Sequence, residues 1–372
     1  MTYPPPPAFE PETPGPEERR RLRTGFSTGA AAAAAALGAA RWLAEGRPPD
    51  RVELALPAGR RLTVELAEAG RDGGGDRRVM VIKDAGDDPD VTHGARISAV
   101  VRLVRTPGLD LSGGPGVGRV TKPGLTLPVG QWAINPGPRA IMRDNLAPHL
   151  PPDGPGLAVS LEVARGEELA LKTLNPRLGV VGGLSILGTT GLVKPYSHGA
   201  YVAAIDSAMS VAQAARLREI VLSTGGRSEA FAQAVRPELP EASFVQMADF
   251  FRAALRLAAR HGFAAVGVAD FFGKAVKQAA GLDCTHAHRA DLDLSLLADW
   301  LPGLAPPLRR AVSTAPTALA ALEVLKAGGA LAAADAVAAR AHAAARAFLG
   351  PGPALWLRVF DFDGTTLALV ED

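Results

Sequence analysis

The spacing of apolar runs changes near residue 175, and this change constrains the fold more than any other feature. Beyond it, short apolar runs at residues 178–181, 219–222, 244–246 and 263–268 alternate with longer helix-favouring segments. Strands that alternate with helices are typical of a parallel sheet covered by helices on both faces. We therefore predict a three-layer α/β/α domain of Rossmann-like type. Its predicted helices cover residues 199–217, 247–260 and 273–280, and an alanine-rich helical part follows at residues 290–347.

The first half of the chain has a strand pattern instead. Apolar and polar residues alternate over residues 52–56 and 62–66 around a Pro-Ala-Gly turn, which predicts a hairpin. Alternation returns at residues 95–104 and 157–163, and one alanine-rich helix follows residue 28. We predict an α+β domain with a mixed sheet for this half.

These patterns divide the chain into four predicted regions. They are a disordered proline-rich tail at residues 1–20, the α+β domain with binding loops at 21–174, the α/β domain at 175–350, and a closing β-hairpin at 351–372. The hairpin is predicted because two alternating runs flank Asp363-Gly364, a turn-forming pair.

The composition limits the classes of partner. The chain of 372 residues has 40 basic and 38 acidic residues, a net charge of +2, which argues against nucleic acid. No run reaches the roughly 18 to 20 apolar residues of a membrane span. The single cysteine, Cys284, excludes an internal disulfide and suits a reducing compartment. We expect a cytoplasmic protein, and the composition leaves a homo-oligomer open.

A helix-start segment (residues 24–29, TGFSTG) precedes the alanine-rich helix. Its glycines would let an anion approach the free amides and the positive end of the helix dipole. The alternative is an ordinary helix capped by Ser27 or Thr28. Both interpretations stay open at this point.

An acidic segment (residues 83–94) holds four aspartates, Asp84, Asp87, Asp88 and Asp90, together with His93. Carboxylates this close repel one another unless they meet a cation or one of them is protonated. A hard metal ion would suit such oxygen ligands, but the spacing does not match an EF-hand loop. A solvated acidic turn is the alternative that we favour over a protein-bound metal.

A basic segment (residues 113–124 and 134–139) carries Arg119, Lys122 and Arg139 on a backbone rich in glycine and proline. Arginine in a fixed position suits bidentate recognition of carboxylates. The alternative is a surface loop with incidental charge.

A glycine segment (residues 175–191) contains a short apolar run, two adjacent glycines and a loop rich in small hydroxyls. Such loops bind ligands at the carboxyl ends of strands in α/β sheets. A second glycine loop at residues 223–227 follows another predicted strand. We predict that the two loops line one nucleotide-sized cleft. A glycine-rich crossover without a ligand is the alternative.

Taken together, these segments resemble the cobalt-precorrin-5B C-1 methyltransferase family, the CbiD family. The matching blocks are residues 22–29, 83–94, 116–128, 175–191 and 273–277, in the family's order. Two positions depart from the family's pattern. Ala30 stands where the family commonly has cysteine, and Asp270-Phe271-Phe272 stands where it often has Gly-His, so neither a thiol nor that histidine has a role here.

The resemblance implies transfer of a methyl group from S-adenosylmethionine to a ring carbon of a tetrapyrrole-derived cobalt macrocycle. The sulfonium methyl is already electrophilic, so aligning the reactants and excluding water are what the protein must do. Cobalt is then carried by the substrate, and we expect no metal site on the protein itself.

The resemblance also implies roles for individual residues. The macrocycle has several carboxylate arms, for which cations and hydroxyls are suitable partners. The substrate-binding candidates are Arg23, Thr24, Ser27, Thr28, Lys83, Arg119, Lys122, Arg139, Arg177, Lys274 and His286. The donor-binding candidates are Gly182, Gly183, Ser185, Gly188, Thr189, Thr190, Gly225 and Gly226. The candidates for moving a proton or orienting the macrocycle are Asp84, Asp87 and His93.

Two other classes of function remain as alternatives. A small-molecule phosphotransferase would also use a glycine loop and an acidic loop, although no Walker Gly-Lys-Thr/Ser element is present. A non-catalytic corrinoid-binding protein would need the same cations without a methyl donor.

Overall fold

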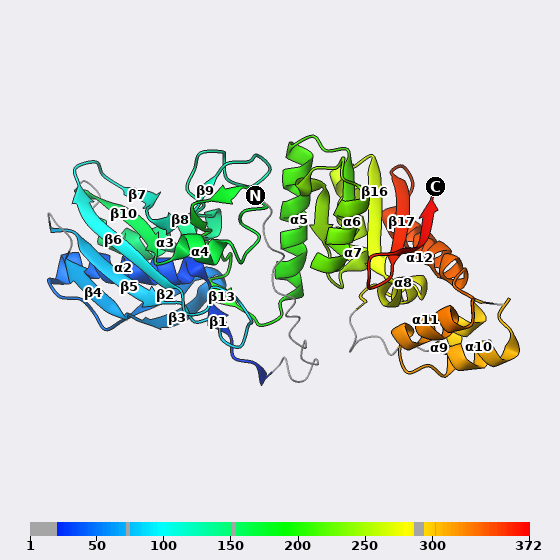
Figure 1. Cartoon of the computed structure of the whole chain (residues 1–372). Helices are drawn as coiled ribbons and strands as arrows, with labels where there is room; N and C mark the ends of the chain where they lie inside the picture. Colours follow the sequence, from blue (N-terminus) through cyan, green and yellow to red (C-terminus); the bar gives the residue numbers. More distant parts are fainter. Residues whose placement is uncertain (1–20, 72–74, 151–153, 286–293, 302) are drawn as a thin grey trace. The chain divides into compact units, whose positions relative to one another are not determined.

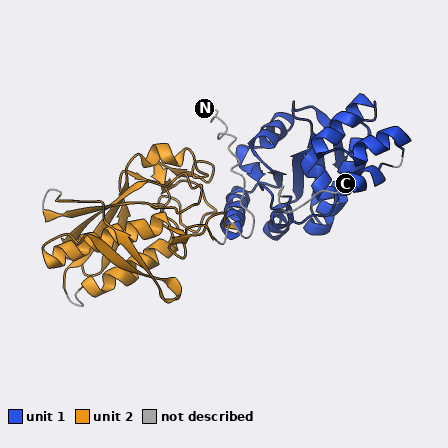
Figure 2. Ribbon diagram, turned by 90° about the horizontal axis from the view of Figure 1, so that it is seen from below, with its two compact units in different colours: residues 1–10, 198–372 blue, residues 11–197 orange. Residues whose placement is uncertain are grey.

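The computed structural model describes the chain except for residues 1–20, 72–74, 151–153, 286–293 and 302 (Figure 1). The predicted tail at residues 1–20 therefore lies outside the described residues. The described residues form two compact units, an N-terminal unit that ends at Ser197 and a C-terminal unit over His198–Asp372 (Figure 2). In the described part, no helix is long and apolar enough to cross a membrane.

The N-terminal unit is built on a five-stranded mixed sheet in the order β4-β5-β6-β10-β7. Neighbours in this sheet are antiparallel except for β10 and β7, which are parallel. The predicted α+β class with a mixed sheet is thus confirmed. The strands are β4 (Glu68–Arg71), β5 (Arg77–Ile82), β6 (Arg96–Val104), β10 (Gly156–Val163) and β7 (Leu109–Gly113).

The alanine-rich helix α2 (Thr28–Glu45) packs against this sheet. Residues 30–36 are all alanine and are completely buried, because small side chains let the helix lie close to the strands. Gly46 ends the helix in the left-handed conformation that glycine adopts readily. The predicted hairpin is confirmed as β2 (Arg51–Leu56) and β3 (Arg60–Glu65). Helices α3 (Pro136–Leu146) and α4 (Gly166–Ala170) also belong to this unit.

Six two-residue strands connect segments that are far apart in the sequence. They pair as β1 (Gly25–Phe26) with β13 (Leu192–Val193), β9 (Arg119–Val120) with β11 (Val180–Val181), and β8 (Gly116–Val117) with β12 (Gly183–Leu184). These pairings attach the glycine segment to the N-terminal unit. The boundary between the units consequently falls at residues 197/198 instead of the predicted 174/175. A strand, β11, does form inside the predicted run at 178–181, but it pairs with β9 and does not join the α/β sheet.

The C-terminal unit contains a second five-stranded mixed sheet in the order β15-β14-β16-β17-β18. The first four strands are parallel, and β18 is antiparallel to β17. The strands are β14 (Glu219–Ser223), β15 (Phe244–Gln246), β16 (Ala265–Phe271), β17 (Ala354–Phe360) and β18 (Thr366–Glu371). The predicted closing hairpin is β17 and β18, and it forms the edge of this sheet and not a separate region.

Helices cover both faces of the second sheet. Helix α6 (Gly226–Val235) shares one apolar cluster with Val221, Ala269 and Trp356. The opposite face packs against α5 (His198–Ala214), α7 (Phe251–His261), α8 (Phe272–Ala279) and α12 (Ala333–Leu349). If these five strands are numbered 1 to 5 along the chain, their order across the sheet is 2-1-3-4-5. A Rossmann sheet has the order 3-2-1-4-5-6, so the Rossmann-like detail of the prediction is not confirmed. The remaining helices are α9 (Leu294–Asp299), α10 (Pro306–Ser313) and α11 (Ala318–Ala327).

Candidate ligand-binding site

The helix-start, acidic and glycine segments interlock in the N-terminal unit. The Phe26 amide donates to the Asp84 carbonyl at 2.7 Å, and the Ser27 amide donates to the Gly191 carbonyl at 2.9 Å. Thr24 forms an isolated bridge with Gly86, whose φ is +68°. A Cβ atom on Gly86 would lie 2.1 Å from the Arg23 carbonyl oxygen, so only glycine allows this close approach.

The start of α2 is a capped helix and not an open anion site. Its amides are already occupied, since Gly29 donates to the Leu187 carbonyl at 2.9 Å and Ala30 donates to the Ser27 hydroxyl at 3.2 Å. Gly188 packs directly on this cap, and a Cβ atom there would lie 2.2 Å from Ser27 Oγ. The glycine segment therefore supplies an acceptor for the helix start, which favours the capped-helix interpretation of residues 24–29.

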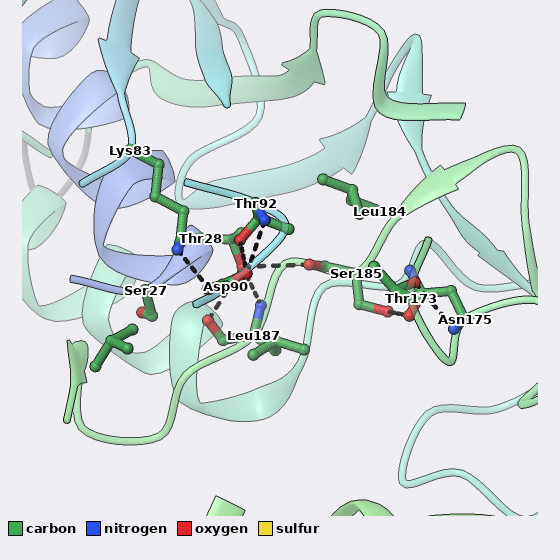
Figure 3. Close-up of a pocket in the computed structure, with 11 residues that line it drawn as sticks. Ser27, Thr28, Lys83, Asp90, Thr92, Thr173, Asn175, Leu184, Ser185 and Leu187 are labelled. Atoms are coloured by element: carbon green, nitrogen blue, oxygen red, sulfur yellow. Dashed lines mark hydrogen bonds and ion pairs between the residues drawn. The ribbon is translucent and has the colours of Figure 1, made fainter. Parts of the chain in front are cut away.

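A cavity of about 160 Å³ lies where these segments meet (Figure 3). Its lining comes from the N-terminus of α2, the acidic segment and the glycine segment with the residues just before it and after it. The lining residues are Ser27, Thr28, Lys83, Asp90, Thr92, Thr173, Asn175, Leu184, Ser185, Leu187 and Val193. Hydroxyl, amide, charged and apolar groups therefore face one small space.

A partly buried ion pair between Lys83 and Asp90 lines the cavity. Lys83 Nζ lies 2.7 Å from Asp90 Oδ2, and the Lys83 side chain is only 1% exposed. The other oxygen of Asp90 accepts the amide and the hydroxyl of Thr92, each at 2.7 Å. Burial by itself would raise the pKa of Asp90, but the Lys83 ammonium and the Thr92 donors outweigh burial and lower it. Asp90 is therefore ionised at neutral pH.

Neutral hydrogen bonds fix the opposite wall. The Thr28 hydroxyl accepts the Leu187 amide at 2.9 Å and lies 3.2 Å from the Ser185 carbonyl. The Asn175 side chain accepts the Ser185 hydroxyl at 3.2 Å and donates to the Gly183 carbonyl at 3.3 Å. Thr28 and Asn175 thus hold the backbone of residues 183–187 against the helix start.

The three candidates for moving a proton or orienting the macrocycle lie together beside Arg23. Arg23 forms a two-pronged ion pair with Asp84 and holds the pKa of that carboxyl down to about 2. Asp87 accepts the Arg23 amide at 2.6 Å. His93 Nδ1 accepts the Ala85 amide at 3.2 Å, which requires that nitrogen to be unprotonated. Asp84 is thus too acidic to hold a proton near neutral pH.

Most of the other predicted cations brace the backbone. Arg119 lies 3.8 Å from the centre of the Trp132 ring and donates to the Gly130 carbonyl at 3.0 Å. Lys122 donates to the Arg177 carbonyl at 3.3 Å, and Arg139 donates to the Ile134 carbonyl at 2.7 Å. Arg119 and Arg23 are the exposed cations of the set, whereas Lys122, Arg139 and Arg177 are half-buried.

The remaining candidates fall elsewhere. Gly225 and Gly226 start α6 in the C-terminal unit, where Lys274 pairs with Asp249. The prediction that the two glycine loops follow neighbouring strands of one sheet is wrong, because the glycine segment pairs with β8 and β9. Thr189 and Thr190 are exposed and do not line the cavity. His286 lies outside the described residues.

The structure offers no cluster for a resident metal within its described residues. No group of three or more His, Cys, Asp and Glu side chains is placed there to hold an ion. The aspartates of the acidic segment have protein partners instead, including Asp88, which accepts the Tyr196 amide at 2.8 Å. Partial burial raises the pKa of Asp88 above its usual value.

Comparison with known proteins identifies the family. The family model described as CbiD matches residues 15–195, and the model described as CbiD, C-terminal domain, matches residues 284–371. The chain is 46% identical over 369 residues to the cobalt-precorrin-5B C(1)-methyltransferase of Salinispora arenicola, a match that covers 98% of this chain and 97% of that protein. The chain belongs to the CbiD family.

Proteins of the same name from other organisms show similar agreement. The Nitratidesulfovibrio vulgaris protein is 46% identical, covering 96% of this chain and 95% of its own, and the Thermus thermophilus protein is 45% identical, covering 96% and 97%. A crystal structure of cobalamin biosynthesis protein (cbiD) from Archaeoglobus fulgidus is 27% identical over 72% of this chain and 83% of that one. Its TM-score is 0.38, so it carries no argument about the fold.

The cavity includes residues that no motif had selected as site residues. Asp90, Thr92 and Asn175 line it together with the predicted Ser27, Thr28, Lys83 and Ser185. The Asp90-Val91-Thr92 order was a usable signal, since an aspartate readily accepts the amide two residues later. No local signal marked the burial of Lys83, because that burial depends on segments distant in the chain.

Proposed function

We propose that the protein transfers a methyl group from S-adenosylmethionine to C-1 of cobalt-precorrin-5B, giving cobalt-precorrin-6A in the anaerobic synthesis of cobalamin. The observation that carries this proposal is identity of 44–46% over 369 residues to two proteins named for that reaction. The lone Cys284 supports a cytoplasmic location.

The methyl transfer requires little from the protein beyond positioning the donor and the ring carbon. A ring carbon forms a bond to the methyl carbon, the carbon–sulfur bond breaks, and its electron pair stays on sulfur as S-adenosylhomocysteine leaves. No covalent enzyme intermediate is needed, which agrees with Ala30 in the place of a cysteine. Holding donor and carbon in line and excluding water supplies the rate enhancement.

The carboxylate arms of the macrocycle need cations that solvent can reach. Arg23, with 57% of its side chain exposed, and the exposed Arg119 fit that need best. Each is held by a second contact, Arg23 by Asp84 and Arg119 by the Trp132 ring, so each presents a pre-positioned guanidinium. We assign these two arginines to the macrocycle.

Of the three candidates for moving a proton or orienting the macrocycle, we retain His93, in the orienting role, because the transfer as written moves no proton. The ion pair with Arg23 keeps Asp84 ionised, and Asp87 serves to accept a backbone amide. The imidazole is more than half exposed and its Nδ1 accepts the Ala85 amide, so Nε2 is the nitrogen that a ligand would contact.

Incubation of the full chain with isotopically methyl-labelled S-adenosylmethionine and cobalt-precorrin-5B tests the proposal. Mass spectrometry should find one labelled methyl group on the macrocycle. A His93→Asn variant should slow the transfer about 100-fold, the effect of a misplaced macrocycle, and Arg102→Gln, at an exposed arginine outside the site, should not.

Binding assays distinguish the other two classes. Affinity for ATP without affinity for S-adenosylmethionine would favour the phosphotransferase, and macrocycle binding without transfer would favour the non-catalytic carrier. Either result would overturn the methyltransferase proposal.

A further inference from the structure

We infer that the cavity between Lys83, Asp90 and residues 184–187 binds the methionine end of the methyl donor, through its ammonium and carboxylate groups. The inference rests on the proposed function and adds the location of the donor's amino-acid end to it. Lys83, a predicted partner of the macrocycle, is thereby reassigned to the methyl donor, and Asp90 joins it as a donor-binding residue.

Lys83 and Asp90 both have hydrogen-bonding capacity that no protein group among the described residues uses. An ammonium has three N–H donors, and among the described residues Asp90 is the one acceptor of Lys83 Nζ. Asp90 Oδ2 accepts that single bond, while Oδ1 already has two donors from Thr92. A buried cation with unused donors and a carboxylate oxygen with an unused lone pair thus stand 2.7 Å apart at the cavity wall.

The two opposite charges at the cavity wall restrict the kind of ligand that can bind there. An α-amino acid carries an ammonium and a carboxylate on one carbon, so it can satisfy Asp90 and Lys83 together. A carboxylate arm of the macrocycle carries negative charge alone and would be repelled by Asp90. The charge pattern therefore favours an amino-acid end over a macrocycle arm.

The size and the lining of the cavity also fit the amino-acid end of the donor. The cavity of about 160 Å³ is smaller than the roughly 300–1,000 Å³ of sites that enclose a whole drug-sized ligand, so it holds one end of a longer molecule. Leu184, Leu187 and Val193 offer apolar surface to the methylenes between the α-carbon and sulfur. Leu187 is 48% exposed, which places an open edge on this side for the rest of the donor.

The stability of the fold does not explain the ion pair between Lys83 and Asp90. Removing two charges from water costs free energy that their attraction often fails to offset, so a buried ion pair contributes little to folding. The other aspartates of the acidic segment have partners away from the cavity, and Asp90 alone of the four lines it. A ligand that uses both charges accounts for their position.

Calorimetric titration of the full chain with two probes tests the inference. S-adenosylhomocysteine contains the amino-acid end, and 5′-methylthioadenosine lacks it. Asp90→Asn and Lys83→Met should each weaken S-adenosylhomocysteine binding at least about tenfold, the effect of losing a charge-assisted hydrogen bond. Both should leave the affinity for 5′-methylthioadenosine within about twofold, which also shows that the variants are folded. Asp110→Asn, an exposed change on β7, is the matched control and should alter neither affinity.

Each contrary result has a distinct meaning. Unchanged S-adenosylhomocysteine affinity in both variants overturns the inference and leaves the proposed function standing. Weaker corrinoid binding with unchanged S-adenosylhomocysteine binding assigns the cavity to a macrocycle arm and also overturns it. Failure of the unaltered chain to bind either donor probe, with or without corrinoid, overturns the proposed function together with the inference.

Discussion

Each compact unit contains a carboxylate of low exposure, and the two are held in opposite ways. Asp90 in the N-terminal unit touches the Lys83 ammonium, and its pKa is lowered although burial alone would raise it. Asp270 in the C-terminal unit is 1% exposed, and it accepts the Thr224 amide at 2.9 Å and the Gln278 side-chain amide. Burial outweighs these donors and raises the pKa of Asp270 to about 6.

The difference shows what a direct cation contact does to a buried acid. Neutral donors stabilise a carboxylate, but they do not fully replace the water that burial removes. A permanent charge pair beside a cavity is suited to binding a charged ligand, which is the role inferred for Asp90. A carboxyl that titrates inside the fold instead makes the stability of its unit depend on pH.

The largest expected effect comes from removing the cation of the first pair. Lys83→Met keeps the length of the side chain but leaves Asp90 without its cation, and we expect the free energy of unfolding to fall by about 3–5 kcal/mol. Denaturant titration measures this change. The double variant Lys83→Met/Asp90→Leu should recover most of the loss, because no unpaired charge remains. If the Lys83→Met variant is as stable as the unaltered protein, Lys83 is not what keeps Asp90 charged.

The next effect concerns Asp270 and pH. Its carboxyl titrates near 3.8 in the unfolded chain and near 6 in the folded one, so between these values the folded state holds a proton that the unfolded state has released. The stabilisation that this proton gives is complete below the lower value and is lost as pH rises through the upper one. At about 1.4 kcal/mol for each pH unit, the loss amounts to about 3 kcal/mol.

Asp270→Asn should abolish this slope. Its amide can pair with Gln278, whose side-chain oxygen has no partner in the described part of the chain. The measurement is the free energy of unfolding of both proteins at pH 4 and pH 7. Equal pH dependence in the two proteins would contradict the contrast with Asp90.

The smallest effect compares a glycine from each unit. Gly86→Ala places a Cβ atom against a backbone oxygen at a positive φ, so we expect a loss of about 2–3 kcal/mol. Gly267→Ala meets the Trp356 ring, a side chain and not backbone, without a positive φ, and should cost less, about 1–2 kcal/mol. Thermal unfolding of both variants measures the difference. Equal losses would mean that the glycine segments of the N-terminal unit are no more tightly interlocked than the second sheet.

Local pattern was enough for much of the secondary structure. The alanine-rich helix α2, the hairpin β2 and β3, and the parallel strands β14, β15 and β16 follow from helix propensity and from the spacing of apolar residues, which are properties of neighbouring residues. The long motifs at residues 83–94 and 175–191 likewise identified the CbiD family, which the family models bear out. Together with the helix-start segment at residues 24–29, they also selected Ser27, Thr28, Lys83 and Ser185, which line the cavity.

Only the tertiary structure decided where the glycine segment belongs and what the acidic segment does. Strands of two residues have no period to recognise, and β11 and β12 pair with partners roughly 60 residues earlier in the chain. The burial of Lys83 and its pairing with Asp90 depend on that assembly, because desolvation is set by what packs around a side chain and not by its neighbours in sequence. The sequence by itself determined the elements and the family, and long-range packing determined which charges meet at the cavity.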